Sequence, residues 1–302
     1  MSCNHSAAGG MNRVLAGAAV VLVWSAGSAQ AQPGWVLSHQ KISATEGGGP
    51  RLDNEDRFGV SVASLGDLDG DGVGDLAVGA QLDDDGGFDR GAVWILFLDD
   101  NGTVKSHQKI SSAACGGAPL DNGDQFGFSV VSLGDLDGDG VGDLAVGAIG
   151  DDDGGLDRGA VWVLFLNVDT TGPDPVVTIK SHQKISSTQG GGPRLDNEDL
   201  FGISVASLAD LDGDGVGDLA VGAFDDDDGG RDHGALWILF LDGAACAPCD
   251  TNCDGSVDLT DVEPFIALLL GDEPCDTCAG DANNDGSIDL TDVEAFIACL
   301  LG

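Results

Sequence analysis

Basic residues are scarce in this chain, and their scarcity limits what the protein can bind. The 302 residues include 12 Lys and Arg against 52 Asp and Glu, which gives a formal net charge of −40. Nucleic-acid binding requires a basic surface that neutralises phosphates, so this balance argues against a nucleic-acid partner. It also argues against electrostatic docking to an anionic membrane.

Motifs of the common enzyme classes are also missing. The sequence has no Gly-x-Ser-x-Gly, no His-Glu-x-x-His and no phosphate-binding loop. Gly70, Gly72 and Gly74 form a glycine-rich stretch, but their aspartate neighbours would repel a phosphate. No pair of acids stands apart from the repeated loops described below, as glycosidase chemistry would need. We therefore expect a protein that is not an enzyme.

Long apolar runs are absent as well. Residues 14–24 form an apolar run of 11 residues, which is too short to span a bilayer. The run follows Met11-Asn12-Arg13 and precedes the small-x-small sequence Ala29-Gln30-Ala31, which predicts a signal peptide over residues 1–31. We expect no membrane insertion and a mature protein that is secreted, in the extracellular space or at the cell surface. Disulfides are expected in such an oxidising compartment.

Glycine is abundant, and the chain is built from repeats. With 49 glycines and 42% hydrophobic residues, the composition favours many short strands joined by tight turns over a disordered acidic tail. The segment Phe58–Ala80 returns almost unchanged at Phe126–Ala148 and again at Phe201–Ala223, at successive spacings of 68 and 75 residues. A run of aspartates and then an apolar run follow each copy. The sequence Ser-His-Gln-Lys-Ile-Ser begins at Ser38, Ser106 and Ser181.

Each unit predicts four short strands. In the first unit these are 59–65, 76–79, 93–98 and a strand that ends at Ile110, and the third is expected to be buried on both faces. Asn101-Gly102 predicts a hairpin turn before the fourth strand, because both residues tolerate positive φ. A longer loop, 167–175, replaces this turn in the second unit. The units lie near 58–111, 126–186 and 201–241, within a domain over residues 32–242.

An acidic loop recurs inside each unit. Carboxylates stand at loop positions 1, 3, 5 and 9, with a glycine at position 6 for the sharp turn and a valine carbonyl at position 7. Ca²⁺ prefers six to eight oxygen ligands, so this spacing predicts one calcium site per unit. A turn that merely faces water is the alternative interpretation. The predicted ligands are Asp67, Asp69, Asp71, Val73 and Asp75; Asp135, Asp137, Asp139, Val141 and Asp143; and Asp210, Asp212, Asp214, Val216 and Asp218.

Three other repeated features have plain interpretations. The aspartate runs at Asp83, Asp151 and Asp226 are interpreted as solvated turns, with a second cation or ligand surface as the alternative. The histidines His39, His107 and His182 are interpreted as surface residues of the fourth strand, not as zinc ligands. The tryptophans Trp94, Trp162 and Trp237 are expected in the core.

The unit resembles the FG-GAP repeats of integrin α-chain β-propellers. The matching features are the Phe58-Gly59 pair, the loop from Asp67 to Asp75, and Val78-Gly79-Ala80 in place of Gly-Ala-Pro. The resemblance covers about residues 35–242. It implies a mainly β fold, with propeller blades of four antiparallel strands and one Ca²⁺ per loop. Such propellers usually have seven repeats, whereas this chain has three, and it has no Asp-x-Ser-x-Ser adhesion motif.

Residues 243–302 form a second module, with six of the eight cysteines and an internal period of 31 residues. Two 12-residue calcium loops are predicted there, each feeding a helix, so about five Ca²⁺ are expected in all. An apolar stripe at i, i+3, i+4 and i+7 marks the helices, as in Val262, Phe265, Ile266 and Leu269. The predicted loop ligands are Asp250, Asn252, Asp254, Ser256, Asp258 and Asp261, and Asp281, Asn283, Asp285, Ser287, Asp289 and Asp292.

This module resembles a type I dockerin, because a loop and a helix occur twice without an entering helix. The resemblance covers about residues 249–302 and implies a small α, EF-hand-like domain that docks onto a cohesin-like scaffold. Both helices lack Lys and Arg, unlike many dockerins. The pairs Cys246/Cys249 and Cys275/Cys278 could ligate zinc, but secretion favours disulfides. An antiparallel helix pair would bring Cys299 toward Cys253, and Cys115 is left as an odd thiol.

The repeat region begins with a fourth-strand sequence, Ser38–Ser43, and ends after a third strand at Leu236–Leu241. The leading strand is therefore the one that the last unit lacks. We expect it to pair with the strand at Trp237, within one chain as a three-bladed ring or between chains as a homodimer that completes a propeller. An open arc is the remaining alternative. Free strand edges are an aggregation hazard, which favours closure.

Three functions fit these features. The first is a secreted, calcium-binding, non-catalytic adhesion or binding protein with a docking tail and an extracellular protein or glycan ligand. The second is a structural component of the cell surface or matrix. The third is a non-catalytic subunit of a cohesin–dockerin complex that degrades polysaccharides.

Overall fold

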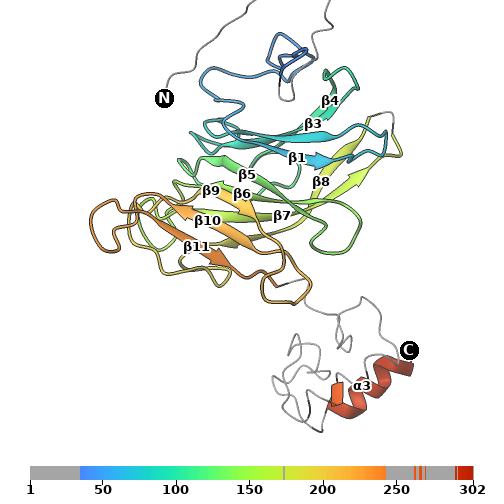
Figure 1. The fold of residues 1–302 in the computed structure, drawn as a ribbon, viewed down its shortest axis with the longest axis vertical. Helices are drawn as coiled ribbons and strands as arrows, with labels where there is room; N and C mark the ends of the chain where they lie inside the picture. Colours follow the sequence, from blue (N-terminus) through green and yellow to red (C-terminus); the bar gives the residue numbers. More distant parts are fainter. Residues whose placement is uncertain are drawn as a thin grey trace, which may run out of the picture. The chain divides into compact units, whose positions relative to one another are not determined.

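The computed structural model describes residues 35–172 and 174–242 and, further on, residues 262, 265, 266, 269, 290 and 292–301. Within these ranges the chain forms three antiparallel sheets and one helix (Figure 1). The strands are β1 (Val62–Gly66), β2 (Asp75–Ala80), β3 (Ala92–Leu98), β4 (Val104–Ile110), β5 (Phe126–Gly134), β6 (Asp143–Ala148), β7 (Ala160–Asp169), β8 (Val176–Ile185), β9 (Phe201–Ser207), β10 (Leu219–Ala223) and β11 (Ala235–Leu239), and the helix is α3 (Asp292–Leu301).

The sheets follow the repeats of the sequence. The first sheet has the order β1-β2-β3-β4, the second β5-β6-β7-β8 and the third β11-β10-β9. The register between the second and third strands is the same in each, so that Val78 pairs with Trp94 as Val221 pairs with Trp237. Each sheet with its loops is called a blade below. The predicted four-strand unit is confirmed in two blades, and the third blade has three strands within the described residues.

Successive blades pack face to face through apolar side chains. Val93, Ile95 and Phe97 of β3 are fully buried in a cluster that also holds Phe126 and Leu144 of the second blade. On the other face of β3, Trp94 and Leu96 belong to a separate cluster. The prediction that this strand is buried on both faces is therefore confirmed for the first blade. A second cluster joins the second blade to the third in the same way.

The Phe-Gly pair that opens a repeat fits against the blade before it. The hydroxyl of Ser61 donates to the carbonyl of Gly127 at 2.8 Å, and that of Ser129 donates to the carbonyl of Gly202 at 2.6 Å. A methyl group on Gly79 would overlap the Gly127 carbonyl, so the two backbones can approach only because Gly79 has no side chain. Gly127 itself has a φ of +89°, which L side chains rarely adopt.

Two predicted connections differ from the observed ones. In the hairpin at Asn101-Gly102 only Gly102 has a positive φ, of +80°, while the Asn101 side chain accepts a hydrogen bond from the Thr103 amide at 2.8 Å. The turn therefore needs one left-handed residue and not two. The insertion predicted as a loop over 167–175 mostly lengthens the hairpin, because β7 and β8 stay paired out to Asp169 and Val176.

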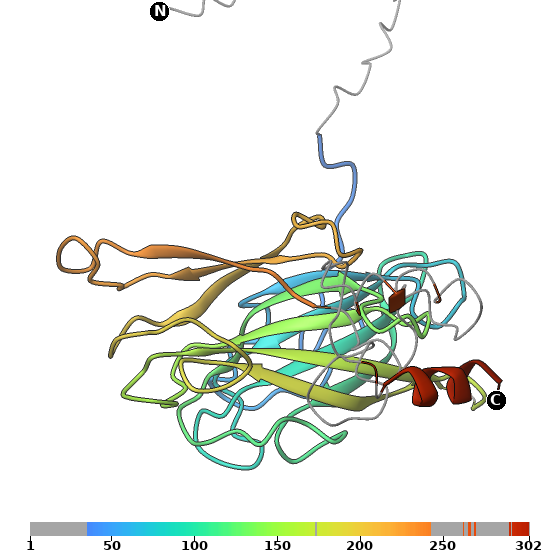
Figure 2. The same ribbon diagram turned by 90° about the horizontal axis from the view of Figure 1, so that it is seen from below.

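The two ends of the repeat region are unpaired within one chain. Residues 35–42 lie in no strand, and Ser43 forms only an isolated bridge with Glu46. Among the described residues no strand pairs with the outer edge of β11, which Figures 1 and 2 show in orange. The pairing that was predicted for the strand at Trp237 is therefore not formed within one chain. The described blades are an open array, not a three-bladed ring.

The described part of the C-terminal region has a helical, twofold-repeated core. Phe265 and Phe296, which are 31 positions apart in the sequence, stack with ring centroids 3.8 Å apart. Val262 and Leu269 pack there with Val293 and Leu300, as the predicted stripe requires. The prediction is wrong for two members of that stripe, because the side chains of Ile266 and Ile297 are each 49% exposed.

Three smaller findings complete the description. Cys299 is disulfide-bonded, and its predicted partner Cys253 lies outside the described residues. Cys115 is a free thiol, as expected, and is half-buried. No helix in the described part of the chain has the length and apolar character needed to cross a bilayer.

Candidate metal centre

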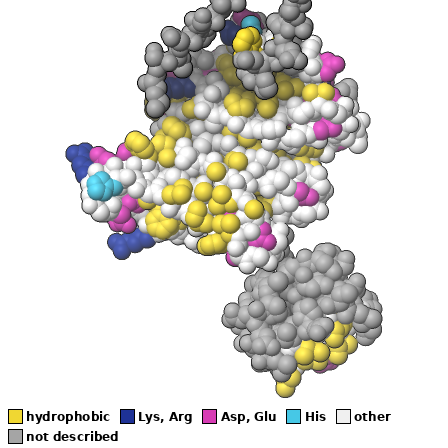
Figure 3. Space-filling model, in the orientation of Figure 1, with side chains coloured by type: hydrophobic (Ala, Val, Ile, Leu, Met, Phe, Trp, Pro, Cys, Tyr) yellow, Lys and Arg dark blue, Asp and Glu magenta, His cyan; other side chains and the backbone are white. Residues whose placement is uncertain are grey.

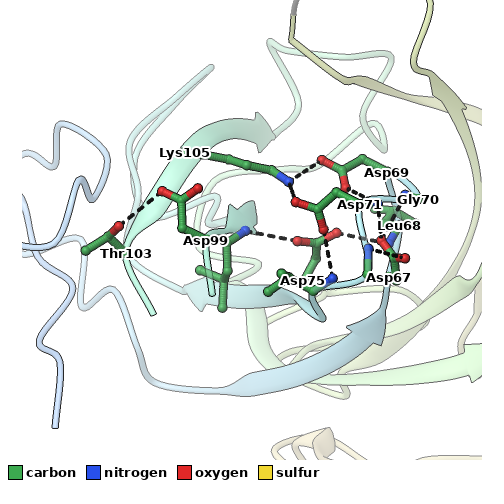
Figure 4. Close-up of polar contacts among 12 residues, drawn as sticks. Asp67, Leu68, Asp69, Gly70, Asp71, Asp75, Asp99, Thr103 and Lys105 are labelled. Carbon is green, nitrogen blue, oxygen red and sulfur yellow. Dashed lines mark hydrogen bonds and ion pairs between the residues drawn. The ribbon is translucent and has the colours of Figure 1, made fainter. Parts of the chain in front are cut away.

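Each predicted calcium loop of the blades joins the first strand to the second, and its carboxylates wind it inward. Asp67 accepts hydrogen bonds from the amides of Gly70 and Gly72, both at 2.8 Å (Figure 4). Asp71 accepts one from the amide of Val73 at 2.8 Å. Gly70 and Gly72 have φ values of +78° and +90°. The glycines supply the turns, and the aspartates hold the backbone in a tight coil.

In every blade, three carboxylate side chains of this loop converge. Their nearest oxygens lie within 4.8 Å of one another. Ligands on opposite sides of one Ca²⁺ lie about 5 Å apart, since each Ca–O distance is about 2.3–2.6 Å. The donors are hard oxygens that repel each other without a cation, so the arrangement fits Ca²⁺. The groups are Asp67, Asp69 and Asp71 in the first blade, Asp135, Asp137 and Asp143 in the second, and Asp210, Asp212 and Asp218 in the third.

The aspartate at loop position 9 has a structural role that the spacing did not reveal. Asp75 is fully buried, where one carboxylate oxygen accepts from the amide of Leu68 at 2.9 Å and the other from the amide of Leu98 at 3.0 Å. Asp143 and Asp218 repeat this pattern. Burial raises the pKa of Asp75 and of Asp143. This residue therefore ties the loop to the end of the third strand.

A lysine from the fourth strand enters the loop in two blades. The Nζ of Lys105 lies 2.7 Å from Asp69 Oδ2 and also pairs with Asp71 (Figure 4). The hydrogen bond from Lys105 lowers the pKa of Asp71. Lys180 stands 2.6 Å from Asp137 in the second blade. Sequence reasoning missed both lysines, although each precedes a Ser-His-Gln-Lys sequence.

The loop of the third blade has no such lysine among the described residues. Burial, and then the nearby charges of Asp212 and Asp210, raise the pKa of Asp214. Hydrogen bonds from the amides of Gly213 and Gly215 lower the pKa of Asp210. Within the described range this loop therefore concentrates negative charge with no cationic side chain to offset it.

The aspartate runs form a second acidic cluster, and the interpretation as solvated turns is wrong for Asp83, Asp151 and Asp226, which are buried. Asp83 is 2% exposed, and Lys109 lies 2.6 Å from it and 3.1 Å from Asp85. Lys184 repeats this with Asp151 at 2.5 Å. The run is thus anchored by a lysine of the fourth strand, 26 residues later for Asp83 and Lys109.

A further buried aspartate stands near each run and was not predicted. These are Asp56, Asp124 and Asp199, and each accepts a hydrogen bond from a backbone amide three residues earlier. Burial, with the nearby charge of Asp151, raises the pKa of Asp124 to about 7. Burial and the charge of Asp226 raise that of Asp199.

The tryptophans and histidines of the repeat are partners. Trp94 is buried, the ring of His107 meets it edge-on at 5.4 Å, and Lys109 Nζ lies 5.0 Å from its ring centroid. Trp162 makes the same contacts with His182 and Lys184. The described groups that could hold a metal ion contain aspartates only. His107 and His182 are strand residues that pack on tryptophan, whereas His39, which was also predicted in a strand, lies in none.

Some predicted ligands are not placed in a cluster. Asp75, Asp139 and Asp214 stand outside the converging groups, and Val73, Val141 and Val216 remain predicted carbonyl ligands. Asp292 begins α3. The other predicted ligands of the C-terminal loops lie outside the described residues, namely Asp250, Asn252, Asp254, Ser256, Asp258, Asp261, Asp281, Asn283, Asp285, Ser287 and Asp289.

Comparison with known proteins supports the blade interpretation. The FG-GAP repeat family matches residues 58–96 and 126–164. Integrin alpha-PS2 of Drosophila melanogaster is 35% identical over 175 residues, which is 56% of this chain and 12% of that protein. Integrin alpha-5 of Xenopus laevis is 34% identical over 173 residues, 55% of this chain and 15% of that protein. The chain therefore spans a small part of the length of these relatives. The first two blades match FG-GAP repeats, part of the chain is similar to integrin alpha chains, and all three antiparallel blades have aspartate-rich loops.

Proposed function

We propose that this protein is a secreted, non-catalytic binding protein whose blades are stabilised by calcium. The observation that carries the proposal is the recurrence of one aspartate cluster, in the same loop of all three blades, with oxygens within 4.8 Å. The family match and the similarity to integrin alpha chains support it. The predicted signal peptide, residues 1–31, supports secretion to the extracellular space or cell surface.

The proposed calcium ions have a structural role. Each would be held by the aspartates of one loop, together with the carbonyl at position 7, and would neutralise carboxylates that otherwise repel. Stabilisation of the loop by calcium would extend to the sheet through Asp75, because Asp75 links the loop to the end of β3. The proposed ligand of the blades is an extracellular protein or a glycan.

The C-terminal module is proposed to be a dockerin-like docking tail with two more calcium ions, about five in total. Its two halves place Ile266 and Ile297 at equivalent positions, and each side chain is 49% exposed. Paired, exposed apolar side chains of this kind favour a protein partner. A cohesin-like scaffold is the proposed partner. This favours a subunit of a scaffolded, polysaccharide-degrading complex as the second candidate, ahead of a structural matrix component.

Calcium titration of the full chain tests the proposal. Calorimetry and metal analysis of the chelated protein should give about five bound Ca²⁺, and calcium should raise the melting temperature because it binds only the folded form. Asp69→Asn should remove one site, whereas Asp100→Asn, an exposed aspartate outside the loops, is the matched control. A melting temperature unchanged by millimolar calcium would contradict the proposal.

The tail is tested separately. The full chain is passed over immobilised cohesin domains with calcium and with chelator, and Ile266→Asp is compared with the parent. Calcium-dependent retention that Ile266→Asp abolishes supports the docking role. If no cohesin retains the chain, the docking tail is wrong while the calcium-stabilised blades stand.

A further inference from the structure

The outward face of the third blade is apolar and uncovered. We define the trailing face of a blade as the side that packs on the next blade, represented by Val93, Ile95 and Phe97 in the first blade, all fully buried. The equivalent residues of the third blade are Leu236, Ile238 and Phe240, with exposures of 68%, 40% and 60%. Figure 3 shows hydrophobic side chains gathered over this part of the molecule. The third blade therefore has the surface of an inner blade without a neighbour.

The hydrogen bond that joins successive blades also lacks its acceptor at the third blade, within the described part of the chain. In the first two blades a serine hydroxyl donates to the glycine carbonyl of the next Phe-Gly pair, from Ser61 and from Ser129. Ser204 holds the equivalent position, is exposed and has no acceptor among the described residues. Gly222 repeats Gly79, yet a side chain on Gly222 would meet only atoms of its own sheet.

Among its described residues, the third blade also lacks the lysine that pairs with the buried aspartates of the other blades. Asp226 and Asp199 are 6% and 3% exposed, like their counterparts in the other blades. There the counterparts of Asp226 pair with Lys109 and Lys184, which belong to fourth strands. The third blade has no fourth strand within the described range, and no described lysine or arginine pairs with Asp226. Asp226 accepts a hydrogen bond from the amide of Asp228 at 2.9 Å, but a buried carboxylate with no cationic partner is costly, so a cation from elsewhere would stabilise this site.

The chain has a further segment with the sequence of a fourth strand, which lies in no sheet and includes a lysine at the required position. Ser38–Ser43 repeats the sequence of Ser106–Ser111, which places Lys41 at the position of Lys109. Lys41 pairs only with Glu46, at 3.6 Å, and its side chain is 66% exposed. Ile42 packs against the first blade on the side away from the second, together with Leu52.

That packing shows where this strand belongs. Ile110 ends a fourth strand and packs in the cluster between its own blade and the next, with Leu120. Ile42 and Leu52 pack against the equivalent cluster of the first blade, although no blade precedes it among the described residues. Val62 is exposed on this side, whereas its counterpart Val130 is buried between blades. The leading face of the first blade thus carries a segment with a fourth-strand sequence, placed where the fourth strand of a preceding blade would lie.

We propose that the trailing face of the third blade docks on the leading face of the first blade in a second copy of this chain, whose Ser38–Ser43 becomes its fourth strand. The same contact is made twice within each chain, which identifies the occupant. Two copies joined head to tail in this way would form a six-bladed ring in which every blade has four strands and β11 is paired on both sides.

Repeat equivalence sets the register of the new pairing. Trp94 pairs with Lys109 and Ile95 with Gln108, and the second blade has the same register. Trp237 should therefore pair with the Lys41 of the second copy, and Ile238 with its Gln40. Lys41 would then reach Asp226, and Ser204 would donate to the carbonyl of Gly59.

The first test is the mass of the full chain in calcium, by light scattering after size exclusion. A mass of two chains is expected. Phe240→Asp should reduce it to one chain, whereas Phe88→Asp is the matched control, since Phe88 is 67% exposed in a loop of the first blade. Lys41→Glu should also give single chains. Asp228 is the counterpart of Asp85, which pairs with Lys109 at 3.1 Å, so adding Asp228→Lys to Lys41→Glu should restore the double mass. A single-chain mass for the parent protein overturns the proposal.

A cross-link test distinguishes a second copy from the chain's own N-terminal segment. The variants Gln40→Cys and Ile238→Cys are prepared separately and mixed under oxidising conditions. A covalent species of two chains should form in the mixture and in neither variant alone. Replacing Gln40→Cys by Lys41→Cys, which is out of register and faces the other side, should prevent it. If instead the doubly substituted chain closes on itself and the mixture stays unlinked, the proposal is wrong.

Discussion

Replacing Lys105 with glutamine should tighten calcium binding by the first blade loop. Lys105 Nζ stands 2.7 Å from Asp69 Oδ2, so the ammonium occupies the surroundings that a calcium ion would share. Glutamine keeps much of the side-chain length and removes the charge. Calcium would then bind without displacing the lysine ammonium and without being repelled by it.

Two limits bound the size of the effect. If the lysine swings away when calcium binds, the loss is one partly buried ion pair near the surface, for which the range for surface pairs, about 0.2–1 kcal/mol, gives up to about fivefold in affinity. If it stays, an ion about 2.5 Å from the same carboxylate lies about 4.5 Å from Nζ, where repulsion with a divalent ion in water is about 1.8 kcal/mol. That corresponds to about twentyfold. We expect tightening between about twofold and twentyfold, and less at high salt.

Site-resolved titration measures this effect. The amide signals of Gly70 and Gly72 in nuclear magnetic resonance follow the first loop during calcium addition, and calorimetry gives the whole chain. Arg231→Gln is the charge-matched control, because the Arg231 side chain is 89% exposed in the third blade. Unchanged or weaker binding in Lys105→Gln would refute the competition argument and would instead make Lys105 a support of the loop.

Two further predictions follow from the packing and the buried acids. Gly79→Ala should destabilise the chain by about 1–3 kcal/mol in denaturant unfolding, since its methyl group overlaps the Gly127 carbonyl. Gly222→Ala should cost less in chains kept single by Phe240→Asp, because its methyl group would meet only side chains of its own sheet. Asp124→Asn should be more stable than the parent above pH 7, and the difference should vanish toward pH 4. The folded pKa of Asp124 is raised to about 7 from 3.8, so the parent binds a proton on folding within that window and loses stability as pH rises through it. Equal pH profiles for the parent and variant would contradict this second prediction.

The sequence predicts local features well, because the repeat presents them three times. Strand spacing and the loop from Asp67 to Asp75 depend on residues close in the chain, and both were found where expected. Features that join distant residues were missed. The burial of Asp83 depends on Lys109, and the contact of Ser61 with Gly127 spans 66 positions and two blades. Neither follows from the residue types alone.

Two aspartates of the repeat show why a pattern of acids is ambiguous. Asp83 and Asp69 belong to similar acidic runs, yet the first is anchored in the protein and the second lines a candidate metal site. Both clusters receive a lysine of the fourth strand, Lys109 or Lys105, and among the described residues only in the cluster of Asp69 do three carboxylates converge as a metal site would need. Such a division appears only when the strands are assembled.

The same division predicts which calcium loop depends most on the metal. The leading copy of the fourth strand has Lys41 at the position of Lys109 but Leu37 at the position of Lys105. If this strand completes the third blade, it offsets the buried Asp226 and leaves the loop at Asp210 without a lysine. That loop then relies on calcium alone, whereas the first two loops keep a lysine to offset part of their charge.

On chelation, the third loop should therefore open before the other two. Hydrogen exchange of the full chain, followed while calcium is lowered stepwise, should show protection lost first over residues 210–218 and later over 67–75 and 135–143. Introducing a lysine with Leu37→Lys should remove the difference if the leading strand serves the third blade. Simultaneous opening of all three loops in the parent would show that lysine does not set their calcium dependence.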